Sequence, residues 1–263
     1  MAEPFEAIGF RINDEASYQA LAMEAHDRGT ITHLFRPKGI LHGSCWSLGA
    51  GLEVWTMVYE SPKGTYFADC RPAFRNRQVY QFYPWEILEF EQDGEALLTG
   101  SLRHGEGLEL VFALQNLTEL NLRQLPWSEV TAAVSGLAYR AKVLRPSRQR
   151  REPMIRAGLS GRECAENDYE LRGSILAWRE LRNQHTTSHL IWIRLDLGRL
   201  NLEILVNRAD LDGLPKVGEW LTAEIWLQGY MLNEQQLEAR YEGPDQRIPR
   251  QHQWRQLRRE RGL

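Results

Sequence analysis

The sequence holds little cysteine and has no long apolar run. Three cysteines occur in 263 residues, far apart at Cys45, Cys70 and Cys164. This spacing suits neither a disulfide framework nor a thiolate zinc site, so it predicts free thiols in a reducing, cytoplasmic compartment. No stretch approaches the roughly 18 consecutive apolar residues of a membrane helix, and the first ten residues lack the basic and apolar regions of a secretory signal. We therefore expect no membrane contact.

Familiar catalytic motifs are also missing. Gly43, Gly49 and Gly51 have neither the Lys-Ser/Thr of a P-loop nor the spacing of a dinucleotide-binding turn. His185 and His189 are four residues apart, but their neighbours are typical of a loop and a strand, and no Glu follows His185. The sequence predicts no assigned catalytic residue, no metal and no cofactor.

Charge is distributed unevenly along the chain. The net charge is −3, yet residues 142–156 hold six basic residues against one Glu, and residues 245–263 hold six Arg against two acidic residues. Two basic segments are therefore attached to an acidic body. Such segments are typical of a solvated linker and tail, or of contacts for an anion or an acidic partner. Nucleic acid is the less favoured partner, because the acidic body would repel a duplex.

The apolar content of 43% suffices for a full core, and the pattern of residues predicts an α+β fold that is predominantly antiparallel β. A helix is expected to begin with Asn13 as its cap and to end at Gly29. Hairpins are expected over residues 52–68 and 95–114. A short helix is expected at residues 129–134 and a strand at 137–144.

The second half of the chain predicts a small β module. Strands are expected at residues 169–178, 190–197, 200–206 and 220–231, with a tight turn at Gly198-Arg199. Closely spaced strands of this kind favour an OB-like module, or a small barrel or sandwich. The predicted organisation is thus an N-terminal α+β domain (1–144), a basic linker (145–167), the C-terminal module (168–241) and a basic tail (242–263).

Five short phrases are scattered along the chain: Ala-Ile-Gly-Phe at 7–10, Leu-Gln-Asn at 114–116, Ser-Gly-Leu at 135–137, an Asn-x-x-Asp-Leu-x-Gly-x-Pro-x-x-Gly turn at 207–218, and Trp-Leu-Gln-Gly at 226–229. In these phrases the chain resembles an uncharacterised bacterial family, a domain of unknown function. No catalytic residue comes with this resemblance, so it informs the fold more than the activity.

The turn at 207–218 has two interpretations. Asn207 and Asp210 can hydrogen-bond neighbouring amides and Gly213 can adopt a positive φ, which favours a purely architectural role. The alternative is a polar pocket in which Asn207, Asp210 and Gln228 face a ligand. Both interpretations stay open at this point.

Arginines provide the candidate anion or partner sites. Arg71, Arg75 and Arg77 form a compact basic cluster that could bind a phosphate or carboxylate. The tail offers a second group, comprising Arg255, Arg258 and Arg259. Four aromatic residues follow the first cluster and predict either core or an interface anchor: Tyr80, Phe82, Tyr83 and Trp85.

These observations favour a non-enzymatic protein-binding or assembly protein whose partner is another protein or a second copy of the chain. One alternative is an enzyme with a dispersed polar site near His42 and Cys45, since a Cys activated by a His can act as a nucleophile. A second alternative is a nucleic-acid-binding OB-like module, in which Trp178 or Trp192 would stack on bases.

Overall fold

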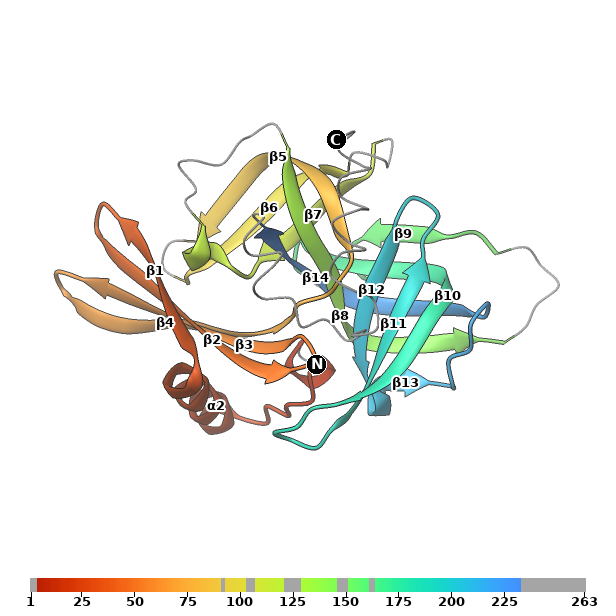
Figure 1. Cartoon of the computed structure of the whole chain (residues 1–263), viewed down its shortest axis with the longest axis horizontal. Coiled ribbons are helices and arrows are strands. Elements are labelled where there is room, and N and C mark those ends of the chain that lie inside the picture. Colours follow the sequence, from red (N-terminus) through yellow and green to blue (C-terminus); the bar gives the residue numbers. More distant parts are fainter. Residues whose placement is uncertain are drawn as a thin grey trace, which may run out of the picture.

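The computed structural model describes residues 4–90, 93–102, 107–120, 129–145, 151–160 and 164–232 (Figure 1). It is rich in strands, and most neighbouring strands are antiparallel. This confirms the α+β class with predominant β structure. The elements of the first half are α1 (Pro4–Ala7), α2 (Glu15–Arg28), β1 (Thr30–Arg36), β2 (Gly39–Gly49), β3 (Leu52–Ser61), β4 (Gly64–Phe74), β5 (Val79–Phe90), β6 (Glu95–Leu102), β7 (Glu109–Leu114) and η1 (Leu117–Glu119). Those of the second half are β8 (Val130–Leu144), β9 (Met154–Ala157), β10 (Asp168–Arg182), β11 (His189–Asp196), β12 (Asn201–Asn207), η3 (Arg208–Asp210), β13 (Leu211–Asp212) and β14 (Trp220–Leu232).

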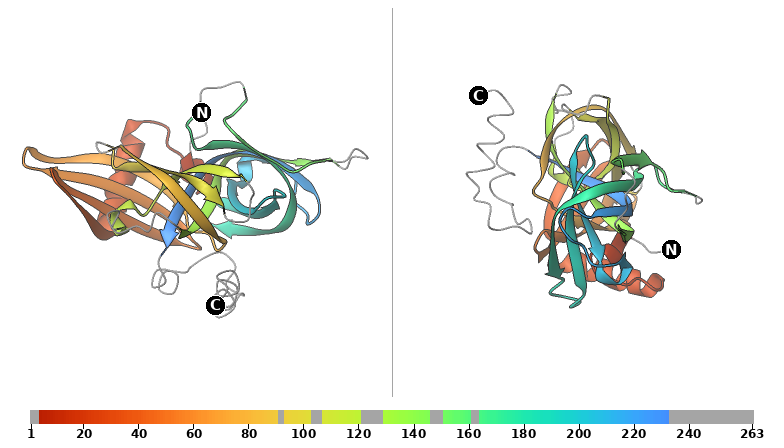
Figure 2. Two further views of the ribbon diagram at one scale, coloured as in Figure 1. Left: turned by 90° about the horizontal axis from the view of Figure 1, so that it is seen from above. Right: turned by 90° about the vertical axis from the view of Figure 1, so that its right-hand side faces the viewer.

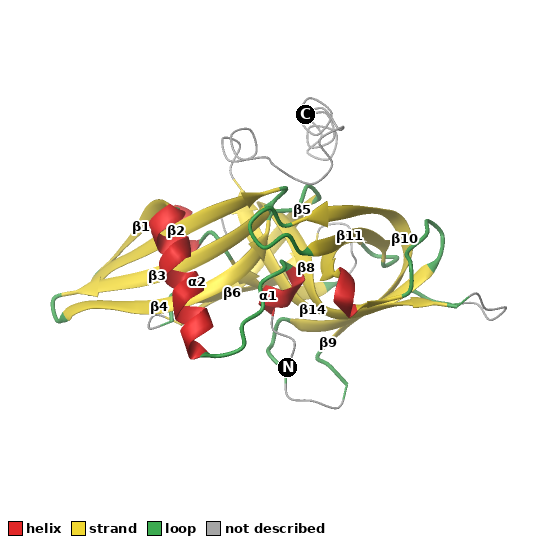
Figure 3. Ribbon diagram, turned by 90° about the horizontal axis from the view of Figure 1, so that it is seen from below, coloured by secondary structure: helices red, strands yellow, loops and turns green. Residues whose placement is uncertain are grey.

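A four-stranded antiparallel sheet in the order β1-β2-β3-β4 carries α2 on one face (Figure 3). The helix is capped by Asp14, whose side chain accepts from the amide of Ser17 while the Ser17 hydroxyl accepts from the amide of Asp14. The expected helix is therefore present, but its cap lies one residue after Asn13. Among the described residues, no helix is long and apolar enough to cross a membrane.

Eight of the other ten strands form two closed rings that share one pair of strands, β8 and β14 (Figures 1 and 2). The remaining two, β9 and β13, pair with β10 and β8. The first ring runs β8-β5-β6-β7-β14 and closes through the β8–β14 pair. The second ring runs β8-β12-β11-β10-β14 and closes through the same pair. Each ring contains one parallel pair, β7–β14 in the first and β8–β12 in the second.

The shared pair reaches both rings because its strands are long. β8 has 15 residues and β14 has 13, and a strand of 15 residues spans roughly 50 Å. In the first ring, β5 pairs with residues 130–133 of β8. In the second ring, β12 pairs with residues 135–138 of the same strand. Residues 130–138 are buried without interruption. The short helix expected at residues 129–134 is therefore wrong: Val130–Val134 are the first residues of β8.

The boundary predicted at residue 144 coincides with the end of β8, yet this strand pairs with β12, β13 and β14, which all follow it. The four strands expected at 169–231 are present as β10, β11, β12 and β14. Within the segment expected to be a linker, Met154–Ala157 form β9, which pairs with β10. The tail at 242–263 lies outside the described residues.

Replacing Gly229 with Ala tests the shared pair of strands. A Cβ atom at this position would lie 2.8 Å from the Ala133 carbonyl oxygen and 2.9 Å from the Phe112 ring. We expect Gly229→Ala to lower the free energy of unfolding by about 1–3 kcal/mol, measured by urea denaturation, because the backbone atom cannot move aside. Thr222→Ala, at a half-buried position of the same strand, should cost less than about 1 kcal/mol. Equal losses in the two variants would contradict the close approach.

Candidate functional site

The most elaborate polar cluster lies inside the protein and is centred on Glu53. Arg75 donates from Nε to one carboxylate oxygen at 2.8 Å. The Tyr230 hydroxyl and the Trp55 indole N–H donate to the other oxygen at 2.7 and 2.9 Å, and the Arg75 guanidinium lies 4.0 Å from the centre of the Tyr230 ring. Burial alone would raise the pKa of Glu53, but the charge of Arg75 and these hydrogen bonds leave that pKa below its usual value.

The three arginines predicted as an anion site are all buried. Arg75 already has a carboxylate partner in Glu53. Arg71 donates to the carbonyl oxygens of Gly94 and Leu114 at 3.3 and 3.5 Å and lies 3.7 Å from an Asp69 carboxylate oxygen. Arg77 is also buried and follows the end of β4 in the sequence. An external partner therefore meets none of these three guanidinium groups at the surface.

The arginines of the tail, at 255, 258 and 259, lie outside the described residues. Their contact with an anion or a partner stays a prediction.

Gln228 lies at the junction of the two rings and is fully buried. Its side chain donates to the Phe74 carbonyl oxygen at 2.7 Å, as does the Ser135 hydroxyl at 2.9 Å. Asn116 exchanges hydrogen bonds with the backbone of Met231 at 2.8 and 3.2 Å. Three of the phrases noted in the sequence, at 114–116, 135–137 and 226–229, thus meet here, where they join β7, β8 and β14.

The other two phrases meet at a second place, around α1. Asn207 donates to the Glu6 carbonyl oxygen at 3.0 Å and accepts from the Ala209 amide at 3.1 Å. Ser188 donates to the Gly9 carbonyl oxygen at 2.8 Å, and Gly9 has a φ of 91°. A Cβ atom at Gly9 would lie 2.7 Å from the Ser188 Cβ, so the close approach requires glycine. The turn beginning at Asn207 is therefore held to α1 at Glu6, and residues 7–10 are held to Ser188, in each case by a side chain that donates to a backbone carbonyl oxygen.

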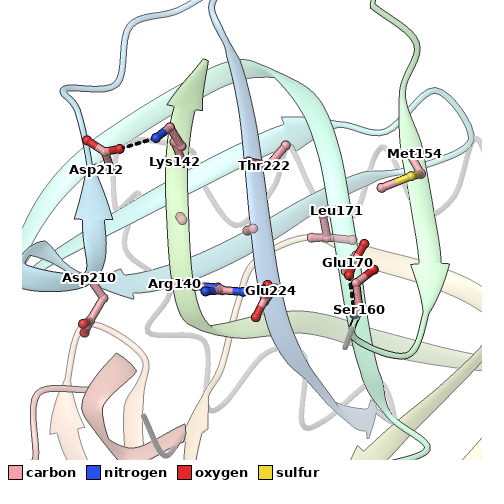
Figure 4. A pocket seen from close by; sticks show the side chains of 12 residues that line it. Arg140, Lys142, Met154, Ser160, Glu170, Leu171, Asp210, Asp212, Thr222 and Glu224 are labelled. Carbon is pink, nitrogen blue, oxygen red and sulfur yellow. Dashed lines mark hydrogen bonds and ion pairs between the residues drawn. The ribbon is translucent and has the colours of Figure 1, made fainter. Parts of the chain in front are cut away.

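Beside this contact lies a hollow of about 700 Å³, lined in part by Asn207, Arg11 and His189. Asp210 instead lines a different hollow, of about 560 Å³, over β8, β14 and β10 (Figure 4). The predicted polar pocket is thus not assembled: Asn207 and Asp210 line different hollows and Gln228 is buried elsewhere.

The hollow beside Asp210 carries charges of both signs. Lys142 pairs with Asp212 at 2.7 Å and Arg140 pairs with Glu224 across the strands (Figure 4). Burial raises the pKa of Asp210, although Arg11 opposes this. Because both cations of the hollow already have carboxylate partners, the surface has no evident preference for an anion.

His42 and Cys45 do not form a catalytic pair. They are three residues apart on β2, so their side chains point to opposite faces of the sheet. Cys45 packs against the main core, whereas His42 contacts His33 and Glu60 at the surface. Burial raises the pKa of the Cys70 thiol, which makes the thiolate form harder to reach.

The aromatic segment after the arginines divides between core and surface. Phe82 is fully buried and packs edge-on against Phe112 at 5.3 Å between ring centres. The Tyr83 hydroxyl donates to Glu129 at 3.2 Å, and the Tyr80 hydroxyl donates to the Asn201 carbonyl oxygen. Trp85 is exposed. The core interpretation therefore holds for Phe82, whereas an interface anchor at Trp85 stays a prediction.

One surface feature escaped the sequence analysis: β1 is an edge strand. Among the described residues it pairs only with β2. Ile31 and Phe35 lie on the same side of this strand, and they are 48% and 74% exposed. The apolar residues of this strand, Ile31, Leu34 and Phe35, do not alternate regularly with polar ones. The sequence therefore did not show which side of the strand is covered. Exposure of apolar side chains along a free edge marks a candidate contact surface.

The Glu53 cluster gives a prediction about stability and pH. Glu53→Gln removes the charge facing buried Arg75, and we expect a loss of about 3–5 kcal/mol at pH 7. Since the pKa of Glu53 is lowered below 4.5, its contribution is present above about pH 4.5 and is lost as the pH falls through the lower folded value. Thermal unfolding from pH 7 to pH 3 should therefore show the two proteins converging in acid.

The matched control is Asp212→Asn, which breaks an ion pair whose side chains are both more than 60% exposed. It should change the unfolding free energy by less than about 1 kcal/mol. A Glu53→Gln variant as stable as this control at pH 7 would show that the buried cluster contributes nothing.

Comparison with known proteins gives one match. Residues 159–229 match the family model described as "Domain of unknown function, E. rectale Gene description (DUF3881)". No curated protein and no solved structure matches the chain. The matched segment runs from just after β9 into β14 and includes the turn at 207–218 and the phrase at 226–229. The resemblance to an uncharacterised family is thereby confirmed, and over this segment the chain is similar to a domain of unknown function.

Proposed function

We propose that this protein binds another protein and that the free edge of β1 is the contact. The observation that carries the proposal is the exposure of Ile31 and Phe35 on a strand with only one described neighbour. An edge strand presents unpaired N–H and C=O groups, to which an extended segment of a partner can add as a further strand. The apolar side chains would then contact alternate side chains of that segment.

The composition of β1 supports this role. Natural edge strands are commonly protected by Pro, by Lys or by inward-pointing charges. The seven residues Thr30–Arg36 include neither Pro nor Lys, and the single charged residue, Arg36, pairs with Glu89 at 2.6 Å. Residues 30–35 therefore carry none of these protections, whereas the Arg36 side chain, at the end of the strand, is 7% exposed and points inward.

The basic tail supports a second contact in the same proposal. Its six arginines contrast with the acidic character of the rest of the chain, which suits an acidic partner surface or a second copy of this chain. The three cysteines are free, which is compatible with action in the reducing cytoplasm.

A nucleic-acid role has weaker support. The five-stranded ring β8-β12-β11-β10-β14 suits the OB-like description. However, stacking on bases needs accessible aromatic side chains. Of the two tryptophans of this module considered for stacking, Trp192 is buried and donates to Glu203 at 2.8 Å, while Trp178 is 36% exposed. Protein binding is therefore the function we propose.

A double variant of the edge tests the proposal. Ile31→Lys with Phe35→Lys should reduce capture of the partner from the native host at least tenfold, measured by quantitative mass spectrometry after nuclease treatment, because charge on the strand opposes pairing. The matched control is Met23→Lys with Val217→Lys, which changes two apolar residues outside β1 that are 69% and 67% exposed. Partners retained by the edge variant, or lost equally from the control, would contradict the role of β1. Light scattering of the pure protein would identify a second copy as the partner.

Deletion of residues 245–263 tests the tail separately. We expect partner binding to weaken, with a steeper dependence on salt in the full chain than in the truncated one, while the melting temperature stays within about 2 °C. The measurement is a titration of the captured partner at two ionic strengths. Unchanged affinity at low salt would remove the tail from the proposal.

A further inference from the structure

We propose that His33 and His42 form a binding site for a first-row divalent cation such as Zn²⁺. The two residues lie directly opposite each other on β1 and β2. Their Nδ1 atoms are 2.8 Å apart, and their rings are perpendicular with centres 4.9 Å apart. Two nitrogens of a type that zinc and copper prefer therefore face each other at close range.

Glu60 orients the first of these ligands. Its carboxylate lies 3.0 Å from Nε2 of His42, so it accepts the Nε2–H hydrogen bond. A neutral His42 held in this way has its lone pair on Nδ1, directed at His33. Metal-bound imidazoles show the same arrangement, with the second ring nitrogen donating to a carboxylate. The contact thus supplies a second observation, independent of the histidine pair, that points to a metal.

The proton balance at the site is simple. Without a metal, neutral His33 donates its Nδ1–H to Nδ1 of His42. When the cation binds, His33 moves that proton to its own Nε2, so both Nδ1 lone pairs become available and no proton is released. His33 is exposed, so its Nε2–H can be hydrated by water.

The required movement is small. Zinc–nitrogen bonds of 2.0–2.1 Å at a tetrahedral angle place the two nitrogens roughly 3.3 Å apart, so the rings must separate by about half an ångström and turn until both Nδ1 lone pairs face the cation. Among the described residues no group of three His, Cys, Asp or Glu side chains converges on one position. The protein therefore supplies two ligands and water completes the coordination, which favours exchangeable binding in the micromolar range.

Calorimetric titration of the full chain with ZnCl₂, after dialysis against a chelator, tests the site. We expect one equivalent to bind with micromolar affinity. His33→Asn and His42→Asn should each weaken binding at least fiftyfold, and Glu60→Gln should weaken it about 10–100-fold. The matched control is His185→Asn with His189→Asn, another histidine pair with the usual spacing of ligands, which should leave the affinity unchanged.

A second measurement separates loss of the ligand from loss of the fold. Zinc should raise the melting temperature of the parent protein and of the control, but not that of the His33 and His42 variants, each compared with its own metal-free form. Binding that persists in both variants would overturn the assignment, as would the absence of binding to the parent protein at millimolar zinc. The experiment needs no partner protein, so its outcome is independent of the proposed contact at β1.

Discussion

The antiparallel ladder between β8 and β14 is the interaction on which the rest of the structure depends. It runs the length of β14, from Trp220 opposite Leu144 to Leu232 opposite Thr131. Both rings close only through this ladder, so its loss would expose the backbone groups of two cores at once. The phrases at 114–116, 135–137 and 226–229 gather at its centre because buried Asn116, Ser135 and Gln228 satisfy backbone groups there. These three phrases therefore have a structural role at the junction of the two rings.

The buried charges have a similar structural role. Glu53 on β3, Arg75 after β4 and Tyr230 on β14 connect the four-stranded sheet to the shared pair. A buried ion pair contributes little net stability, but breaking it is costly, so it fixes one arrangement of the sheet against the rings. These buried side chains therefore hold the four-stranded sheet and the shared pair of strands in one arrangement. Interaction with other molecules falls to the surface.

The surface features that suggest function lie together on the four-stranded sheet. Among the described residues β1 pairs only with β2, Phe35 is the most exposed large apolar side chain, and His33 lies between Ile31 and Phe35 on the same strand. These features are independent of the ring architecture, since function resides in sites carried by a fold and not in the fold itself. Strand addition and metal binding would use different groups of β1: backbone groups at the edge for one, and imidazole nitrogens on a face for the other.

Local patterns in the sequence determined α2, the two hairpins, the strands β10, β11, β12 and β14, and the predominance of antiparallel strands, because caps, turns and alternation act over a few residues. Tertiary structure decided the rest. Residues 130–134 looked helical because a strand buried on both faces has no alternation to recognise. The basic run at 71–77 resembled an exposed cluster, and only the pairing of β3 with β4 places Arg75 beside Glu53. The sequence allowed Asn207 and Gln228 to share one pocket, but Asn207 ends β12 beside α1, whereas Gln228 lies on β14 opposite Ser135 at the junction of the two rings. His33 and His42 meet only because β1 and β2 pair in one register, and pairing is a property of two segments that neither shows alone.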